Sequence, residues 1–91
     1  MENKKFELCS DVKQWSDNIV LYRIKALKDF ICDGILIRKG DKGGFVQSEN
    51  NLSQEGNCWV FDDSIVFENA KVYDNAIIKG YSIVQNNSIV S

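Results

Sequence analysis

Residues 60–91 read VFDDSI, VFENAK, VYDNAI, IKGYSI, VQNNSI and VS when the chain is divided into groups of six. The first residue of every group is Val or Ile, and the fifth is Ser or Ala. Cys58 continues the phase of small residues upstream of the first group. A strict period of six fits neither an α-helix, whose period is 3.6, nor an ordinary β-meander. The stretch therefore predicts a repeat of one short strand and one turn for every six residues.

The spacing within each group predicts how the repeats assemble. A small residue and an aliphatic residue two positions later point to the same side of a strand. The third and fourth positions are mostly Asp, Asn, Glu or Gly, of which Asn and Gly best tolerate the left-handed backbone that a sharp corner needs. Corners of one hand coil the chain, so each strand pairs with the strand one coil away. We expect these inward columns: Val60/Ile78, Val66/Val84, Val72/Val90, Ala70/Ser88 and Ser64/Ser82.

The pattern resembles the hexapeptide-repeat proteins, in which three hexads form one triangular coil of roughly 18 residues. The resemblance implies an all-β chain with a short left-handed parallel β-helix of about two coils, at 58–75 and 76–91. Residues 20–91 also resemble the YdcK-like group of small phage and bacterial proteins, through segments at 21–24, 26–27, 29–30, 40–41, 43–46, 51–53 and 56–60. That group has glycine at the third hexad position, where this chain has Asp62, Glu68 and Asp74.

Residues 1–50 are expected to form an N-terminal cap that contains a β-hairpin, and residues 51–91 the β-helix, together as one domain. The apolar run at 19–25 predicts a strand. Residues 30–32 and 35–37 flank Asp33-Gly34, a strong hairpin signal. Residues 10–17 are expected to form one or two helical turns with Trp15 as a buried anchor. Phe45, Val46 and Leu52 are expected to close the open end of the first coil.

The glycine-rich segment at 39–44 has two interpretations. Successive backbone N–H groups of such a loop could bind a phosphate. However, no Gly-Lys-Ser/Thr sequence and no helix follow it, as a phosphate-binding loop requires. A plain turn is the favoured interpretation.

Composition limits the function classes. The net charge is −2, and residues 51–91 contain two basic and five acidic side chains. Direct nucleic-acid binding needs clustered Lys and Arg, so we do not expect it. No apolar run approaches the ~20 residues of a membrane span, and no apolar segment follows the basic N-terminus as in a signal peptide. Cys9, Cys32 and Cys58 are expected to be reduced thiols. A soluble protein of the bacterial cytoplasm is predicted.

Acyl transfer is the first activity to consider, because many hexapeptide-repeat proteins are acyltransferases. The resemblance implies a histidine base, and the chain contains no histidine. Carboxylates at the hexad corners are weak bases at neutral pH unless burial raises their pKa. Cys58 should face the coil interior, away from substrate. We therefore predict no enzymatic activity, no catalytic residue, no cofactor and no metal site.

The outward positions of the hexads are unusually apolar. We expect the N-terminal half to cover one outer face and another chain to cover at least one of the others, because large apolar patches seldom remain exposed on monomers. The hypothesis is a non-catalytic interaction module, which forms a homodimer and binds a host protein as a phage-encoded, anti-CRISPR-like inhibitor of a defence system. The alternatives are a structural or assembly accessory protein and a degenerate hexapeptide acyltransferase. The predicted interaction residues are Trp59, Phe61, Ile65, Phe67, Tyr73, Ile77, Ile83 and Ile89.

Overall fold

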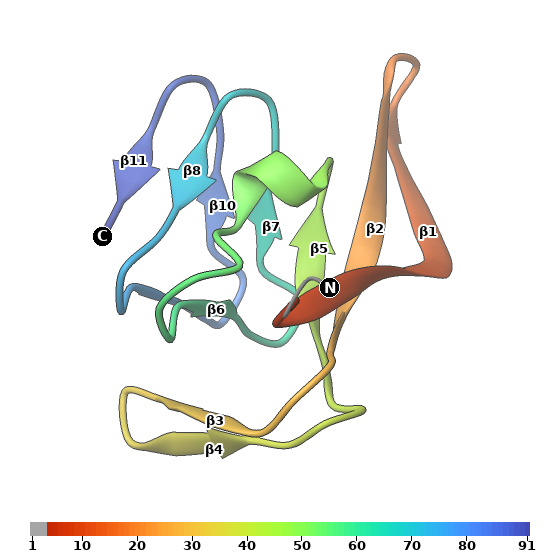
Figure 1. Cartoon of the computed structure of the whole chain (residues 1–91). Coiled ribbons are helices and arrows are strands. Elements are labelled where there is room, and N and C mark those ends of the chain that lie inside the picture. The colour runs from red at the N-terminus through yellow and green to blue at the C-terminus, as the bar shows by residue number, and fades with distance from the viewer. Residues whose placement is uncertain (1–3) are drawn as a thin grey trace.

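A computed structural model describes residues 4–91, and this part of the chain is all-β apart from one 3₁₀ turn (Figure 1). The longer strands come first, and a series of two-residue strands follows at intervals of six residues. The elements are β1 (Phe6–Ser16), β2 (Ile19–Ala26), β3 (Phe30–Cys32), β4 (Ile35–Ile37), β5 (Lys42–Val46), η1 (Glu49–Asn51), β6 (Trp59–Val60), β7 (Ile65–Val66), β8 (Lys71–Val72), β9 (Ile77–Ile78), β10 (Ile83–Val84) and β11 (Ile89–Val90).

The short strands stack in three parallel rows. β6 pairs with β9, β7 with β10 and β8 with β11, and each residue pairs with the residue 18 positions later. Val60, Val66 and Val72 are buried at the centre, as the hexad phase predicts. The six-residue strand period, the three rows and the inward positions of Val60, Val66 and Val72 are therefore confirmed. Val84 and Val90, in the same columns as Val66 and Val72, are only partly buried. Of the predicted columns of small residues, Ser64 and Ala70 are buried, whereas Ser82 and Ser88 are exposed.

The corners between the strands use the left-handed backbone region, as the sequence predicts. Asp62, Glu68, Asp74 and Asn86 have φ between 58° and 63°, and Gly80 has φ 73°. All five are third residues of their hexads. Non-glycine residues adopt this conformation at a cost in free energy, because the Cβ atom crowds the backbone.

The variant Asp74→Gly should therefore be more stable than the wild type. Asp74 is exposed with φ 59°, and glycine adopts that conformation without steric cost. We expect a gain of about 0.5–1 kcal/mol in the free energy of unfolding, measured by urea titration. Asn75→Gly is the matched control, because Asn75 has no positive φ and glycine there should be neutral or destabilising. Equal effects of the two variants would contradict the corner assignment.

The coil begins before the Asn51 start that the hexads suggest. β5 pairs in parallel with β7, through Phe45–Ile65 and Val46–Val66, and Leu52 bridges to Val72. These partners lie 20 positions apart. The upstream coil, which precedes the one predicted at 58–75, is therefore irregular and longer than the regular repeat of 18 residues. Val46 and Leu52 thus extend the core columns one coil upstream, where a plug was expected. Gly43 and Gly44 belong to β5, so the predicted turn at 39–44 is too long.

The prediction of helical turns at 10–17 is wrong. Residues 10–16 belong to β1, which pairs antiparallel with β2 across the Asp17-Asn18 turn. β2 also pairs with β5, so the hairpin continues the sheet in the order β1-β2-β5-β7-β10. Trp15 is 38% exposed, and its ring centroid lies 5.7 Å from that of Phe67. Because β1 is not next to β7 in the sheet, this contact means that the hairpin bends across the sheet's outer side.

The second hairpin matches its prediction. β3 and β4 pair through Phe30–Ile37 and Cys32–Ile35, and Asp33 and Gly34 form the turn with φ 51° and 79°. The hairpin lies beside β6 (Figure 1). The Phe30 ring meets the Trp59 ring with centroids 5.2 Å apart, in an edge-to-face arrangement. The N-terminal segment therefore covers the β6–β9 row as well as much of the β7–β10 row, where only one covered face was expected.

Candidate functional site

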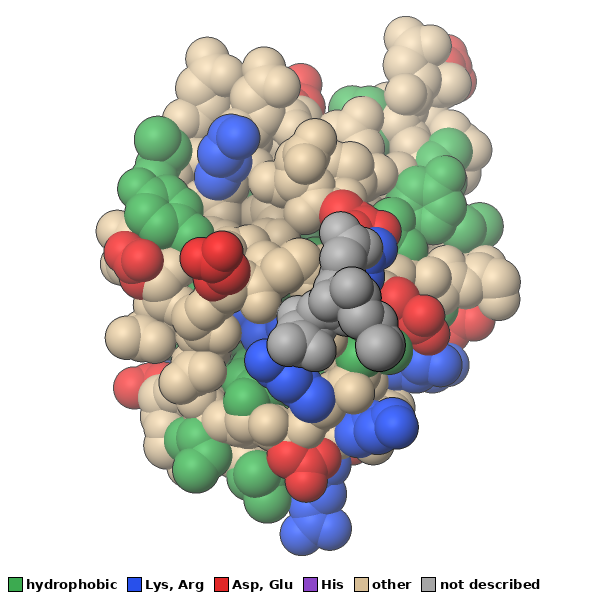
Figure 2. Space-filling model, in the orientation of Figure 1, with side chains coloured by type: hydrophobic (Ala, Val, Ile, Leu, Met, Phe, Trp, Pro, Cys, Tyr) green, Lys and Arg blue, Asp and Glu red, His purple; other side chains and the backbone are tan. Residues whose placement is uncertain are grey.

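The β8–β11 row is the side of the coil that the N-terminal hairpins leave uncovered. Its outward side chains are Lys71, Tyr73, Ile89 and Ser91, and we call them the β8–β11 face. Tyr73 is 37% exposed and Ile89 is 63% exposed. Figure 2, in the orientation of Figure 1, shows hydrophobic side chains gathered over this side of the molecule, with acidic side chains next to them.

Acidic residues lie at both ends of the β8–β11 face. Glu68 is at the corner before β8, and Asp74 is at the corner after it. Glu55 belongs to the loop that stacks on the Asp74 corner, where the Asn57 amide donates to the Asp74 carbonyl oxygen at 3.0 Å. All three acidic side chains are exposed. An apolar centre with a charged rim is the usual arrangement of a protein-binding surface.

The eight predicted interaction residues fall into three groups. Trp59, Ile65 and Phe67 point outward from the coil but are buried beneath the N-terminal hairpins. Phe61 and Ile77 are partly buried against the core. Only Tyr73, Ile83 and Ile89 are exposed, and Ile83 lies on β10 at the edge of the five-stranded sheet. The exposed pair Ile31 and Leu36 on the β3–β4 hairpin was not predicted, because the sequence does not say which side of a free hairpin faces solvent.

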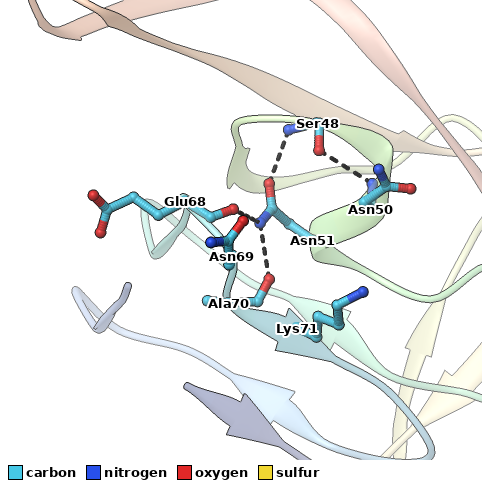
Figure 3. Close-up of a pocket in the computed structure, with 7 residues that line it drawn as sticks. All are labelled: Ser48, Asn50, Asn51, Glu68, Asn69, Ala70 and Lys71. Carbon is cyan, nitrogen blue, oxygen red and sulfur yellow. Dashed lines mark hydrogen bonds between the residues drawn. The ribbon is translucent and has the colours of Figure 1, made fainter. Parts of the chain in front are cut away.

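A polar pocket of about 150 Å³ lies between η1 and the corner before β8 (Figure 3). Asn51 is buried in its wall, accepting hydrogen bonds from the Gln47 and Ser48 amides and donating to the carbonyl oxygens of Glu68 and Ala70. The Glu68 carboxylate points away from Asn51 (Figure 3). Small-molecule sites usually enclose about 300–1,000 Å³ with apolar walls, so this pocket is too small and too polar for an acyl-coenzyme A.

The Asn51 side chain is predicted to be a structural bridge, because its hydrogen bonds join the irregular upstream coil to the regular coil that follows it. Asn51→Leu should lower the free energy of unfolding by about 2–4 kcal/mol, because it leaves buried backbone groups unpaired. Asn50→Ala is the matched control: the side chain is exposed and its loss should change stability by less than about 0.5 kcal/mol. Thermal unfolding followed by circular dichroism measures both. An Asn51→Leu variant as stable as Asn50→Ala would contradict the bridge.

Three side chains away from the pocket, Lys5, Asp11 and Cys32, have pKa values shifted from their ordinary values. Burial lowers the pKa of Lys5, whose side chain is fully enclosed. Burial likewise raises the pKa of the Cys32 thiol. On the surface, the ion pair with Lys42 at 2.9 Å lowers the pKa of Asp11. None of these three groups lines the pocket.

Metal-binding clusters and membrane-spanning helices are absent from residues 4–91. These residues hold no cluster of three or more His, Cys, Asp or Glu side chains that could bind a metal ion. Within the same residues, no helix has the length and apolar character needed to cross a membrane. The three cysteines are free thiols, of which Cys32 and Cys58 are buried.

Comparison with known proteins gives one partial similarity and no match to a family model. A stretch of 49 residues, 54% of the chain, is 37% identical to a protein of Escherichia coli strain K12 named "Uncharacterized acetyltransferase YdcK". The stretch covers 14% of that protein's length. The similarity is consistent with a relationship to the hexapeptide-repeat proteins.

Proposed function

We propose that this chain is a non-catalytic module that binds another protein through the β8–β11 face. The observation that carries the proposal is the exposure of Tyr73 and Ile89 on the one row that the N-terminal hairpins do not cover. Fully burying such a side chain stabilises a complex by roughly 1.5–3 kcal/mol relative to leaving it in water. Tyrosine is also among the residues most often found at the energetic centre of protein interfaces.

The charge around the face indicates the chemistry of the partner. Glu55, Glu68 and Asp74 surround the apolar centre, and Lys71 is the only basic side chain on the face itself. A partner with a basic rim would therefore be complementary. Basic surfaces are typical of proteins that hold nucleic acid. We propose the partner to be such a host protein in the bacterial cytoplasm.

The specific form of the proposal is a phage-encoded inhibitor of a defence system, of the anti-CRISPR kind. Occupying a basic channel would block nucleic-acid binding without any catalysis. The alternative, a structural or assembly accessory protein, would use the same face to bind further copies or another virion protein. The predicted homodimer also stays a prediction, and a second copy is one of the outcomes that the test below separates.

The fold proposed with this function is a left-handed β-helix of the hexapeptide-repeat kind. Parallel pairing of residues 18 apart supports it, since three hexads per coil give that spacing. The positive φ values at one corner position per hexad also support it. A rigid coil of this kind holds Tyr73 and Ile89 in fixed positions, so little conformational entropy is lost on binding.

Acyl transfer is the competing candidate, because the similar E. coli protein is named as an acetyltransferase. Against it, the chain has no histidine to serve as a base, and the pocket at η1 is too small for an acyl donor. Acetyl-coenzyme A at micromolar concentration should therefore leave the melting temperature unchanged. A ligand that binds the native state must raise it, so a shift would favour the competing candidate.

The proposal is tested by comparing two charge substitutions of exposed isoleucines. The tagged chain captures proteins from a bacterial lysate, and a captured protein is then purified and titrated with the wild type, Ile89→Glu and Ile31→Glu. Ile89→Glu should weaken binding by about 10- to 100-fold, because it places a charge at the centre of the interface. Ile31→Glu, on the β3–β4 hairpin, should bind as the wild type does.

Two further readouts complete the test. Binding should weaken as the salt concentration rises, as charge complementarity requires. Light scattering of the free chain distinguishes a monomer of 10.4 kDa from a homodimer of twice that mass. Equal affinity of Ile89→Glu and the wild type, or loss of binding by Ile31→Glu alone, would contradict the proposal. A dimer that only Ile89→Glu dissociates would identify a second copy as the occupant of the face.

A further inference from the structure

Near the start of the described chain, Lys5 is buried without an acidic partner among residues 4–91. Lys5 is fully enclosed, and its Nζ donates to the Cys58 carbonyl oxygen at 2.7 Å and to the Gly56 carbonyl oxygen at 3.4 Å. It also lies 5.3 Å from the centroid of the Phe30 ring. The ion pairs formed within residues 4–91 do not include Lys5. Lysine is rarely buried without a charged partner, so its position calls for an explanation.

The nearest reactive group to this amine is a thiol. The Nζ atom lies 3.3 Å from Cys58 Sγ, and both side chains are fully buried. Cys58 is therefore not an isolated small residue of the core. Cys32 belongs to the same buried cluster, with its Sγ directed to the Ala76 carbonyl oxygen at 3.8 Å.

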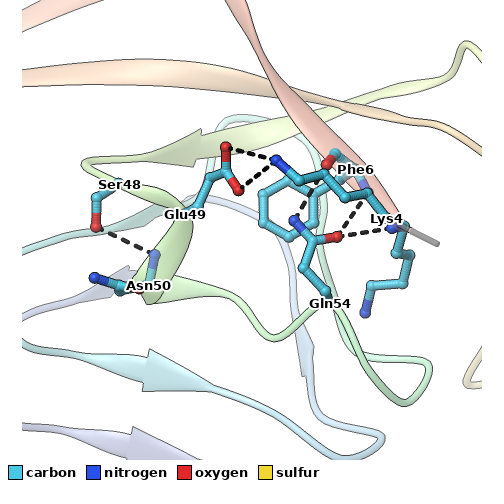
Figure 4. Close-up of polar contacts among 7 residues, drawn as sticks. Lys4, Phe6, Ser48, Glu49, Asn50 and Gln54 are labelled. Carbon is cyan, nitrogen blue, oxygen red and sulfur yellow. Dashed lines mark hydrogen bonds and ion pairs between the residues drawn. The ribbon is translucent and has the colours of Figure 1, made fainter. Parts of the chain in front are cut away.

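The backbone around Lys5 holds the amine in this position. The Gln54 side-chain oxygen accepts hydrogen bonds from the amides of Lys5 and Phe6, and the Gln54 amide donates to the Phe6 carbonyl oxygen. Figure 4 shows the Gln54 amide group facing the start of β1, with the Lys4–Glu49 ion pair beside it. On the other side, the Leu27 amide donates to the Lys5 carbonyl oxygen at 2.7 Å. The two reactive atoms are thus fixed in contact, and such proximity greatly raises the effective concentration of the amine.

We propose that Lys5 Nζ and Cys58 Sγ form an oxidative modification site, where an oxygen atom links the nitrogen to the sulfur. The amine, the thiol and dioxygen react to give the N–O–S bridge and water. One N–H and the S–H bond break, the O–O bond breaks, and new N–O and S–O bonds form. The second oxygen leaves as water with the two hydrogens. Sulfur and nitrogen each lose two electrons, and dioxygen gains four.

Several features of the site suit this chemistry. The amine must be neutral to react, and burial lowers the pKa of Lys5, which favours its neutral form. A sulfur oxidised beside a fixed amine has a partner in contact, and enclosure excludes the water and thiols that would otherwise intercept it. Reduction by a dithiol would cleave the bridge and restore the amine and the thiol. The bridge would join the start of β1 covalently to the end of the first coil, across 53 residues of chain.

The experiment compares the purified full chain in aerated buffer, where dioxygen is the oxidant, with the chain kept reduced. The intact mass should rise by about 14 Da, from the gain of one oxygen and the loss of two hydrogens. One of the three thiols should become resistant to alkylation, and a peptide containing both Lys5 and Cys58 should appear. Dithiothreitol should reverse all three changes. The oxidised chain should also melt about 10 °C higher, because the bridge restricts the unfolded chain.

Substitutions test whether Lys5 Nζ and Cys58 Sγ are the two atoms that the oxygen joins. Cys58→Ser and Lys5→Arg should each abolish the bridge. Arginine is chosen because it keeps a positive charge beside the Gly56 and Cys58 carbonyl oxygens. Cys9→Ser is the matched control, since Cys9 lies on β1 outside the buried cluster, and it should form the bridge as the wild type does. A disulfide between Cys32 and Cys58, seen as the loss of two hydrogens, would overturn the proposal. So would sulfinic acid at Cys58 formed equally in the wild type and in Lys5→Arg.

Discussion

Val66→Asp is expected to unfold the chain at room temperature. Val66 is fully buried between Val46 and Val84 in the central column. A carboxylate at this position would lose its hydration without gaining a partner, at a cost of several kcal/mol. Small domains are stable by only about 5–15 kcal/mol in total, and this one is at the small end of the range. Far-ultraviolet circular dichroism and a thermal scan would show the loss of structure.

Val84→Asp is the control in the same column. Val84 occupies the equivalent position on β10, one coil later, but it is only partly buried. The aspartate there can reach water, so the loss of stability should be clearly smaller. A Val66→Asp variant that melts within a degree or two of the wild type would contradict the inward column.

Gly44→Val is expected to destabilise the chain by about 3 kcal/mol. A Cβ atom at Gly44 would lie 2.5 Å from the Ser64 carbonyl oxygen and 2.6 Å from a Val60 methyl group. That carbonyl oxygen accepts the hydrogen bond from the Phe45 amide at 2.9 Å, so relief of the clash would separate β5 from β7. Urea unfolding measures the loss.

The control for this variant is Gly34→Asn in the β3–β4 turn. No atom lies within 4 Å of a Cβ built at Gly34, and asparagine tolerates its φ of 79° better than other side chains do. The change should cost less than about 1 kcal/mol. If both variants were equally stable, β5 would not pack against β7 as closely as described.

The regular coils could be predicted from the sequence because their signal is local and repeated. Each hexad places an aliphatic residue, a small residue and a corner at fixed positions, and the same chemistry recurs five times. The upstream coil was not predicted, and a plug was expected there, because insertions lengthen its repeat from 18 to 20 residues. Gly44 and Val46 do keep the spacing of a small residue and an aliphatic residue, which was an available signal.

β1 was missed for a different reason. Phe6, Leu8 and Val12 alternate with polar residues, and Asp17-Asn18 can form a two-residue turn, but Ser10 interrupts the apolar series. Tertiary pairing with β2 then decides the conformation.

The side of the coil that stays open could not be predicted from the sequence either. Which outward residues are covered depends on where two hairpins fold back, and Trp59 and Tyr73 occupy comparable outward positions with opposite outcomes.

The β8–β11 face is the surface that we propose binds another protein. Amide hydrogen exchange of the chain, alone and in complex with the purified captured protein, tests it most directly. We expect slower exchange at residues 71–73 and 89–91 in the complex, with β1 and the β3–β4 hairpin unchanged. Slower exchange confined to β1 or to the β3–β4 hairpin, with residues 71–73 and 89–91 unaffected, would contradict it.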